Sequence, residues 1–411
     1  MRRFLPLLLL LSGCYEAIEK LPGKEFQVRL PIMTWANQYV VDRSELRTSG
    51  VFCKWPDDRC NVILADMQYE MRTGKWTNAA LVEIKRPGIQ STAPVPYDVN
   101  ENACLMDPLL KDLPCSPNFV VKALGVNDPL LLKQWGLTKI GGNKAANKIG
   151  GLPGPLVAVL DTGIKADHED LSGQVVSCFD AVTGVAGTCS DLNTHGTNCA
   201  GIIAAKRNNA IGISGICPNC KLMGIKFLGA NGSGSIFDAI KGIDYAIQNG
   251  ARVINASFGG GGYSAPFREA VKRANAKGVL IVAAAGNSGL DTDSYPSYPA
   301  SYDEPNVLSI AATDEKGKLA SFSNFGKESV DIAAPGTNIL SSRNDGGYGS
   351  ASGTSFSAPA VAGLAGLILS QEPTASIERI KERIFSGIKR NKRLKGKMRY
   401  NGTINAYRSL K

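Results

Sequence analysis

The sequence predicts an α/β fold, with a three-layer domain built on a parallel sheet after a small α+β or mainly β N-terminal unit. From about Pro153 onward, nearly continuous apolar runs alternate with segments of helical periodicity. Strands that are covered by helices on both faces need such runs. Residues 15–120 instead hold short alternating segments, scattered prolines and closely spaced cysteines, so we expect a separate unit there.

The predicted elements of the larger domain follow one another as strand, helix and strand. The predicted parallel strands are residues 156–161, 221–227, 252–257, 279–286 and 306–312. A first helix is predicted after Ser235, which can cap its start, and before Gly250, which can end it. Its expected buried stripe is Ile236, Ile240, Ile243 and Ile247. Residues 264–278 show the same pattern, and this alternation indicates helical layers on both faces of one sheet.

Composition sets the broad class. The chain of 411 residues is 44% hydrophobic and 20% charged, which excludes a wholly disordered or membrane-embedded protein. Much of its net charge of +10 lies in residues 389–399, KRNKRLKGKMR. Such a run can contact nucleic acid or an anionic membrane, but no aromatic residues interleave to stack on bases. We therefore expect a solvated helix end and loop, and no nucleic-acid partner.

Residues 1–13 predict an export signal. Arg2 and Arg3 precede an apolar run, residues 4–11, that is too short to span a bilayer. The run ends in Leu-Ser-Gly-Cys, which resembles the lipobox of bacterial lipoproteins, where the cysteine is acylated and becomes the mature N-terminus. The resemblance implies bacterial export and a membrane anchor through lipid on Cys14. An ordinary signal peptide with a chance cysteine is the alternative.

The ten cysteines are sorted by their spacing. Without Cys14, nine remain for an oxidising compartment, where pairing is expected. Close neighbours suggest the pairs Cys53–Cys60, Cys104–Cys115, Cys178–Cys189 and Cys217–Cys220. Cys199 has no predicted disulfide partner. The last pair, in CPNC, has the spacing of half a zinc site, but no second cysteine pair or spare histidine lies near enough to complete one.

Three segments supply a nucleophile, a base and a carboxylate. Asp161 ends a predicted strand, His195 begins a small-residue helix in NTHGTNCAG, and Ser355 begins an apolar helix after a glycine-containing turn. Parallel sheets place active sites at the carboxyl ends of their strands. A serine hydroxyl needs an imidazole to accept its proton, and the imidazole needs an acceptor that fixes its tautomer. Free N–H groups at the start of the Ser355 helix favour developing negative charge.

The order Asp, His, Ser and the motifs DTGI, HGT, AAAGNSG and GTSFSAP resemble the subtilisin family, in its proteinase K and thermitase-like branch. The resemblance covers residues 125–411 and implies a monomeric serine endopeptidase that acts on proteins or peptides. It implies that Asp161, His195 and Ser355 are the catalytic triad. It also implies that Asn287 is the side-chain donor of the oxyanion hole, paired with the Ser355 backbone N–H.

Other residues near these motifs are not expected to be catalytic. Cys199 matches a cysteine that this branch carries after the catalytic histidine, and we expect a buried free thiol beneath the site rather than a nucleophile. Asn198 replaces a usual histidine and Phe356 a frequent methionine, but neither change removes a catalytic group. His168 in KADHEDL is expected to be structural, because HED is not the HExxH motif of zinc proteases.

Two glycine-rich segments resemble the strands between which the family binds an extended peptide, by addition of a β-strand. The implied binding residues are Gly232, Ser233, Gly234, Ser257, Phe258 and Gly259. Ser297 aligns with a position that is commonly glycine at the base of the primary specificity pocket. Its hydroxymethyl group should shrink the pocket and disfavour the bulkiest aromatic side chains.

The resemblance also implies a structural Ca²⁺ site. The implied ligands are the side chains of Asp128, Asp170 and Asn209 and the backbone oxygens of Lys206, Ile211 and Ile213. Oxygen ligands that include two carboxylates suit this ion. The alternative is a pair of solvated carboxylates beside a polar loop.

Three segments follow in order: the signal peptide (1–13), a prosegment-like domain (14–121) and the catalytic domain (122–411). SPNFVVKALGVNDP, from Ser116, resembles the end of a prosegment, although the body before it matches poorly. Cleavage between about Val121 and Asn127 would leave the lipid on the prosegment and secrete the enzyme, whereas an uncut chain would remain tethered.

Two other functions were weighed against a protease. A catalytically inactive peptide-binding lipoprotein of the same fold is disfavoured because all four catalytic positions are intact. An α/β-hydrolase esterase is disfavoured by the missing G-x-S-x-G motif and by the order of the triad.

Overall fold

The computed structural model describes residues 126–411 except Gly261, and before them only the backbone of eight short strands. The chain divides into two compact units, Met1–Gly125 and Val126–Lys411. In the first unit, an antiparallel sheet has the order β1-β3-β6-β2-β7, with β8 also on β2, and β4 pairs with β5. Its strands are β1 (Leu8–Ser12), β2 (Thr34–Asp42), β3 (Cys60–Ala65), β4 (Glu70–Met71), β5 (Gly74–Lys75), β6 (Ala79–Ile84), β7 (Pro94–Val95) and β8 (Cys115–Phe119).

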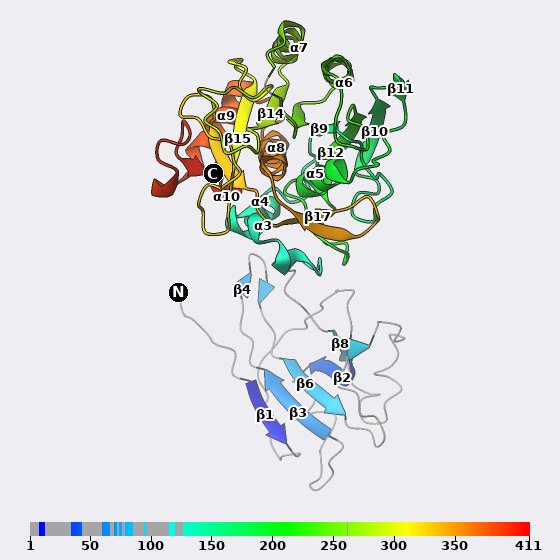
Figure 1. The fold of residues 1–411 in the computed structure, drawn as a ribbon. Helices are drawn as coiled ribbons and strands as arrows, with labels where there is room; N and C mark the ends of the chain where they lie inside the picture. The colour runs from blue at the N-terminus through cyan, green and yellow to red at the C-terminus, as the bar shows by residue number, and fades with distance from the viewer. Residues whose placement is uncertain are drawn as a thin grey trace. The chain divides into compact units, whose positions relative to one another are not determined.

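The second unit is built on a ten-stranded sheet in the order β11-β10-β12-β9-β13-β14-β15-β16-β20-β19 (Figure 1). The pairings from β10 to β20 are parallel, and only the edge strands β11 and β19 pair antiparallel. The strands are β9 (Leu156–Asp161), β10 (Val175–Asp180), β11 (Val185–Ala186), β12 (Lys221–Lys226), β13 (Val253–Ala256), β14 (Leu280–Ala284), β15 (Val307–Thr313), β16 (Ile332–Pro335), β19 (Lys389–Arg390) and β20 (Gly402–Thr403).

The predicted α/β class and its five strands are confirmed, each strand to within two residues at either end. Three parallel strands, β10, β16 and β20, were not predicted. β10 is only half-buried, so its sequence lacks a continuous apolar run, and β16 and β20 have only four and two residues. Strand prediction from apolar runs fails in such cases because partial exposure and short length remove the signal.

Helices cover both faces of this sheet (Figure 1). They are α3 (Trp135–Lys139), α4 (Gly142–Ile149), α5 (His195–Ala204), α6 (Ile236–Gln248), α7 (Ala265–Ala276), α8 (Thr354–Gln371), α9 (Ile377–Ser386) and α10 (Ala406–Ser409), with single 3₁₀ turns η1 (Leu131–Lys133) and η2 (Lys392–Leu394). Val157 and Val159 of β9 belong to the core that includes α5 and α8. Ala158 and Leu160 belong to the core that includes α6 and α7. Alternate residues of one strand thus serve two cores, which explains its unbroken apolar sequence.

The stripe of isoleucines predicted for α6 is confirmed in part: Ile243 is buried and Ile240 and Ile247 are half-buried against the core, but Ile236 is 45% exposed. The centre of the buried face is formed by the smaller residues Ala239, Gly242 and Ala246. A Cβ on Gly242 would lie 2.5 Å from Leu160 Cδ1, so small side chains are what let this helix approach the sheet. The predicted ends hold: Ser235 Oγ accepts the Asp238 N–H at 3.0 Å, and Gly250 follows the helix with φ +79°.

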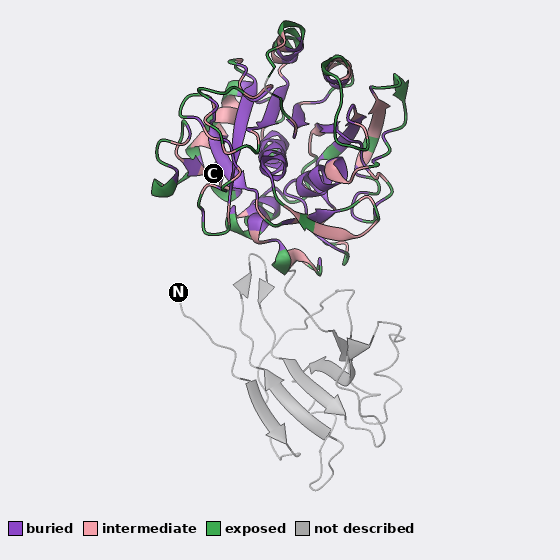
Figure 2. Ribbon diagram, in the orientation of Figure 1, coloured by how far each residue is buried: buried purple, intermediate pink, exposed green. Residues whose placement is uncertain are grey.

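Helix α8 lies in the middle of the second unit, and every one of its residues but Gln371 is buried (Figure 2). A helix that is apolar all round needs such a place. The hairpin of β17 (Ile339–Ser342) and β18 (Tyr348–Ala351) precedes it. Within the described residues, no helix is both long and apolar enough to cross a membrane.

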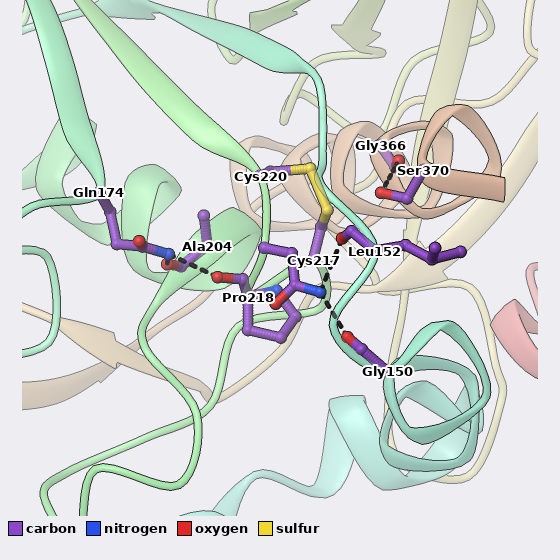
Figure 3. Close-up of a disulfide and its surroundings, with 10 residues drawn as sticks. Gly150, Leu152, Gln174, Ala204, Cys217, Pro218, Cys220, Gly366 and Ser370 are labelled. Atoms are coloured by element: carbon purple, nitrogen blue, oxygen red, sulfur yellow. Dashed lines mark hydrogen bonds between the residues drawn. A yellow bond between two sulfur atoms is a disulfide. The ribbon is translucent and has the colours of Figure 1, made fainter. Parts of the chain in front are cut away.

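Two disulfides stand at core positions. Cys178 is joined to Cys189, and Cys217 to Cys220. The second pair packs against α8 at Gly366, where any Cβ would overlap Cys220 Sγ (Figure 3). Its loop is held further by Gln174, whose amide donates to the carbonyls of Ala204 and Pro218. The expected pairs Cys53–Cys60 and Cys104–Cys115 lie outside the residues whose side chains are described.

Candidate functional site

Asp161 and His195 meet at the carboxyl end of β9. Asp161 is fully buried, and its Oδ1 lies 2.8 Å from His195 Nδ1 and accepts the Thr162 N–H at 2.7 Å. His195 is the first residue of α5. The next residue, Gly196, has no room for a side chain, because a Cβ would overlap the Gly163 carbonyl oxygen. Close contact between α5 and the turn after β9 therefore places the imidazole beside the carboxylate.

The surroundings of His195 act on its pKa in opposite directions. Burial lowers the pKa, but the Asp161 charge, its hydrogen bond and the more distant Asp191 charge raise it, and the result is a pKa above the ordinary 6.5. Because Nδ1 faces a carboxylate, the neutral ring carries its proton there, which leaves the Nε2 lone pair free to accept a proton. The pair has the arrangement of a general base and its orienting group.

Ser355 comes from a different element than Asp161 and His195, because it lies in the first turn of α8. Its hydroxyl donates to the Ser257 carbonyl at 3.0 Å, and within the described part of the chain it makes no hydrogen bond with His195. The Cys199 thiol contacts both Ser355 and Asp161: its Sγ lies 3.4 Å from the Ser355 carbonyl oxygen and 3.8 Å from Asp161 Oδ2. The structure thus brings the three predicted residues into one site, with the serine hydroxyl turned towards Ser257.

Asn287 is held in one orientation by the residue before Ser355. Its Oδ1 accepts both the N–H of Thr354, at 2.8 Å, and the hydroxyl of Thr354, at 2.9 Å. With that oxygen occupied, the amide Nδ2 remains as a donor. The Ser355 N–H is unpaired within the described residues, as expected in the first turn of a helix. Both donors belong to residues that line one pocket of about 310 Å³.

The same pocket is lined by Ser297 and by Phe258, Gly259 and Gly260 of the second glycine-rich segment, residues 257–260. A Cβ on Gly259 would lie 2.8 Å from Ser297 Oγ, so the serine hydroxyl faces the glycine across the pocket. The Phe258 ring is half-buried and packs on Phe227, with ring centroids 4.6 Å apart. The other predicted segment, with Gly232, Ser233 and Gly234, is exposed and lies on a loop outside this pocket's lining.

Asp191 organises the loop before His195, and the motif analysis missed it. Its Oδ1 accepts the Thr162 hydroxyl and the N–H groups of Asn193 and Thr194. Its Oδ2 accepts the N–H and hydroxyl of Thr197. This one carboxylate joins the turn after β9 to the start of α5. Its position four residues before the histidine, in DLNTH, was the available signal, but only the fold shows that the loop closes around it.

Cys199 and Asn198 are both buried on α5. Burial, with the Asp161 charge adding to it, raises the pKa of the Cys199 thiol well above its usual value, so the group is a protonated, unreactive thiol beneath the site. It is the free cysteine among the described residues, as expected. The Asn198 amide donates to the carbonyls of Thr194 and Ser342 at 3.0 and 2.8 Å, which fastens α5 to the β17–β18 hairpin.

His168 lies in the structure as a buried hydrogen-bonded group. Its Nδ1 accepts the Asp170 N–H at 3.1 Å, so its Nε2 is the protonated nitrogen and donates to the Gly347 carbonyl at 3.0 Å. A ring with both nitrogens engaged by backbone has no free position for catalysis. The structural role predicted for this histidine fits these contacts.

The predicted calcium ligands gather beside the loop 206–213. The Asp170 carboxylate accepts from Asn209 Nδ2, the Ile213 N–H and the Tyr348 hydroxyl, each at 2.8 Å. Asp128 is buried and accepts the Asn209 N–H at 3.2 Å, but its Oδ2 has no partner. Burial raises the Asp128 pKa, and the nearby Asp170 charge adds to that effect. An unpaired buried carboxylate oxygen beside a second carboxylate fits a site for a cation.

Known proteins resemble this chain over the second unit. A family model described as the subtilase family matches residues 153–400. Thermitase from Thermoactinomyces vulgaris is 41% identical over 61% of this chain and 87% of its own length. A thermostable alkaline protease from Halalkalibacterium halodurans is 41% identical over 67% of this chain and 73% of its own. The crystal structure of a cold-adapted subtilisin-like serine proteinase aligns at 34% identity and a TM-score of 0.56, over 62% of this chain and 89% of that one.

The network around Asp191 leads to a prediction about His195. In Asp191→Asn, an amide replaces a carboxylate that raises the His195 pKa, so this pKa should fall. The substitution also leaves buried donors unpaired and should destabilise the protein by about 1–3 kcal/mol. Asp180→Asn is the control, because Asp180 also accepts backbone N–H groups but is not among the groups that shift His195. The chain has two histidines, so imidazole NMR signals report the titration directly. An unchanged His195 pKa in Asp191→Asn would contradict this account.

Proposed function

The chain belongs to the subtilase family and is a serine endopeptidase, and from this premise we propose that Asp161, His195 and Ser355 form its catalytic triad. The observation that carries the proposal is the 2.8 Å contact between a fully buried carboxylate and His195 Nδ1, beside a serine at the start of a helix. A buried carboxylate both fixes the imidazole tautomer and stabilises its protonated form.

The proposed reaction begins when the Ser355 hydroxyl turns from the Ser257 carbonyl towards His195. As Oγ attacks the peptide carbonyl carbon, its proton passes to His195 Nε2. The imidazolium then protonates the leaving nitrogen, the C–N bond breaks and the acyl group remains on Ser355. Water then attacks this ester while His195 accepts its proton. His195 returns that proton to Ser355 Oγ as the ester bond breaks, which releases the carboxylic acid product and restores the enzyme.

Asn287 and the Ser355 backbone N–H are the proposed oxyanion hole. Thr354 occupies the Asn287 carbonyl oxygen with two hydrogen bonds, so the amide N–H₂ is held ready without reorganisation. Donors that are oriented before the reaction stabilise the developing oxyanion most, because no free energy is lost in reorienting them as the charge develops.

We propose that an extended substrate lies against the 257–260 segment, with one side chain in the pocket that holds Ser297. Gly260 already exchanges backbone hydrogen bonds with Tyr298 on one side, which steadies the segment. The segment with Gly232, Ser233 and Gly234 would form the opposite side by adding a second strand. Ser297 narrows the pocket, so side chains of middle size should be preferred to the largest aromatics.

Substitution of the catalytic groups tests this proposal. Ser355→Ala should abolish peptide hydrolysis with the fold retained. Asn287→Ala should lower kcat about 10²–10³-fold, the loss known for removal of such a donor, with a smaller effect on KM. Ser288→Ala, which changes the next residue in the same pocket, should remain active. Since His195 acts as a base when neutral, kcat/KM should rise with pH through a value above 6.5. Full activity of Ser355→Ala would overturn the assignment.

We also propose that the chain is exported, is acylated on Cys14, and carries residues 14–121 as a prosegment. Support for a nearby cut comes from the unit boundary at Gly125 and from Leu130, whose N–H is already bound to the Gly212 carbonyl at 2.8 Å. The chain is held to the catalytic unit from Asn127 onward, because Asn127 Oδ1 accepts the Ala210 N–H at 3.0 Å and Asp128 Oδ1 accepts the Asn209 N–H at 3.2 Å.

N-terminal sequencing of membrane and soluble fractions tests this maturation. Active enzyme should begin at about residues 122–128 and be soluble after a wash at high salt, whereas Ser355→Ala should stay full-length in the membrane fraction. If the active form is full-length and only membrane-bound, the segment is a permanent domain and the proposal fails.

Calcium is proposed as a structural ion, held by the carboxylates of Asp128 and Asp170, the side chain of Asn209, and backbone oxygens of Lys206, Ile211 and Ile213. It would neutralise two neighbouring buried carboxylates, and its effect would be on stability rather than on the chemical step. The unpaired Asp128 Oδ2 is the observation in its favour.

Removal of calcium should therefore lower the melting temperature without acting on the catalytic groups. A ligand that binds only the folded state stabilises it by an amount that grows with its concentration. Added Ca²⁺ should raise the midpoint of the wild type and of Asp180→Asn, and should have little effect on Asp128→Asn. Equal midpoints for the wild type with Ca²⁺ and with EDTA would rule the site out.

A further inference from the structure

The C-terminal part of the chain presents a basic face that the catalytic mechanism does not use. Seven of the eleven residues 389–399 are Lys or Arg, and from Arg383 to Lys411 there is no Asp or Glu. We call the exposed residues Lys389, Arg390, Lys392, Arg393 and Lys395 the basic face. They lie on β19, on η2 and just after it, at the red end of the ribbon in Figure 1.

This face has a rigid base. Leu394 and Met398 are fully buried in the core beneath it, so the segment that carries these charges is anchored to the core. Asn391 donates to the Gly317 carbonyl and Arg393 to the Lys316 carbonyl, both at 2.6 Å. Two further exposed lysines, Lys316 and Lys318, thereby lie beside the face and extend it.

Most of these charges are not neutralised. Among the described residues, no ion pair includes any member of the basic face, whereas Arg399 beside it pairs with Asp331. The nearby carboxylates Asp314 and Glu315 are fewer than the lysines and arginines around them. A cluster of like charges costs folding energy through repulsion, and that repulsion is relieved when an anionic surface is near.

The composition of the face discriminates among anionic partners. Protein interfaces are depleted of lysine and are centred on buried aromatic residues, and this face has no such anchor. Nucleic-acid surfaces stack bases on aromatic rings, but the nearby rings already have partners within the chain: Tyr400 is stacked on Phe385, with centroids 3.9 Å apart, and Lys397 Nζ lies 3.7 Å from the Phe325 ring centroid. Exposed lysines on a rigid loop, with no specific pocket, suit the diffuse charge of a lipid headgroup layer.

We propose that the basic face binds the catalytic unit peripherally to anionic phospholipid membranes. The face lies outside the lining of the active-site pocket, so the enzyme can hold a membrane and a peptide at the same time. Such attachment needs no covalent lipid. It would keep the enzyme near a membrane surface even after the proposed loss of the acylated segment, and would weaken as salt concentration rises.

Vesicle sedimentation tests this proposal on the full chain with Cys14→Ser and Ser355→Ala, which is neither acylated nor self-cleaving. It should bind vesicles of equal parts phosphatidylcholine and phosphatidylglycerol at low salt, and should not bind phosphatidylcholine alone. Each lysine near such a surface contributes about fivefold in affinity, so Lys389→Gln/Lys392→Gln/Lys395→Gln should weaken binding on the order of 100-fold. The matched control is Lys133→Gln/Lys144→Gln/Lys277→Gln, three exposed lysines elsewhere, which should bind as the parent does.

Neither triple variant should melt at a lower temperature than the parent, which would show that unfolding is not the cause of any loss of binding. Three outcomes would overturn the proposal: no sedimentation of the parent with phosphatidylglycerol vesicles, equal losses in the two triple variants, or tighter binding to duplex DNA than to vesicles at the same salt concentration.

Discussion

The buried carboxylate of Asp161 is the constraint on which the site depends. β9 lies between β12 and β13 in the interior of the sheet, so its last residue has no access to water. An unpaired charge in such a place costs about 3–5 kcal/mol, and partners must be supplied by whatever packs against the strand end. The Thr162 N–H and the His195 ring supply them. The sheet therefore determines where the histidine must lie, and the first turn of α5 follows from it.

Asp191 holds the segments that carry Asp161 and His195 in place. Its carboxylate collects five donors from the turn after β9 and from the start of α5, which keeps the two segments at the distance that the Asp161–His195 contact requires. Its charge also contributes to the raised pKa of His195. Structural support and electrostatic tuning of the base thus come from one residue that touches neither substrate nor nucleophile.

Helix α8 brings the serine to this pair. The helix is apolar on all sides, so it is stable only in the middle of the unit, where the sheet, α5 and α9 surround it. Gly366 on this helix accommodates the Cys217–Cys220 disulfide, while Ser355 at its first turn meets Ser257 at the end of β13. Packing that stabilises the core also sets the position of the nucleophile, and it leaves the first-turn N–H groups facing the active-site pocket.

The sequence by itself determined the α/β class, the five central strands and the residues that come together in the site, because unbroken apolar runs and dense motifs are local signals. It located the buried face of α6 only in part, because the centre of that face is formed by small residues such as Gly242, where a Cβ would lie 2.5 Å from Leu160. It did not reveal Asp191, because the contact that joins its loop to the turn after β9 comes from Thr162, 29 residues away in the sequence. The direction of the Ser355 hydroxyl towards Ser257 was equally beyond it. Local pattern identifies which groups can do chemistry, but contacts between segments far apart in the chain decide how those groups are held, and such contacts exist only in the folded structure.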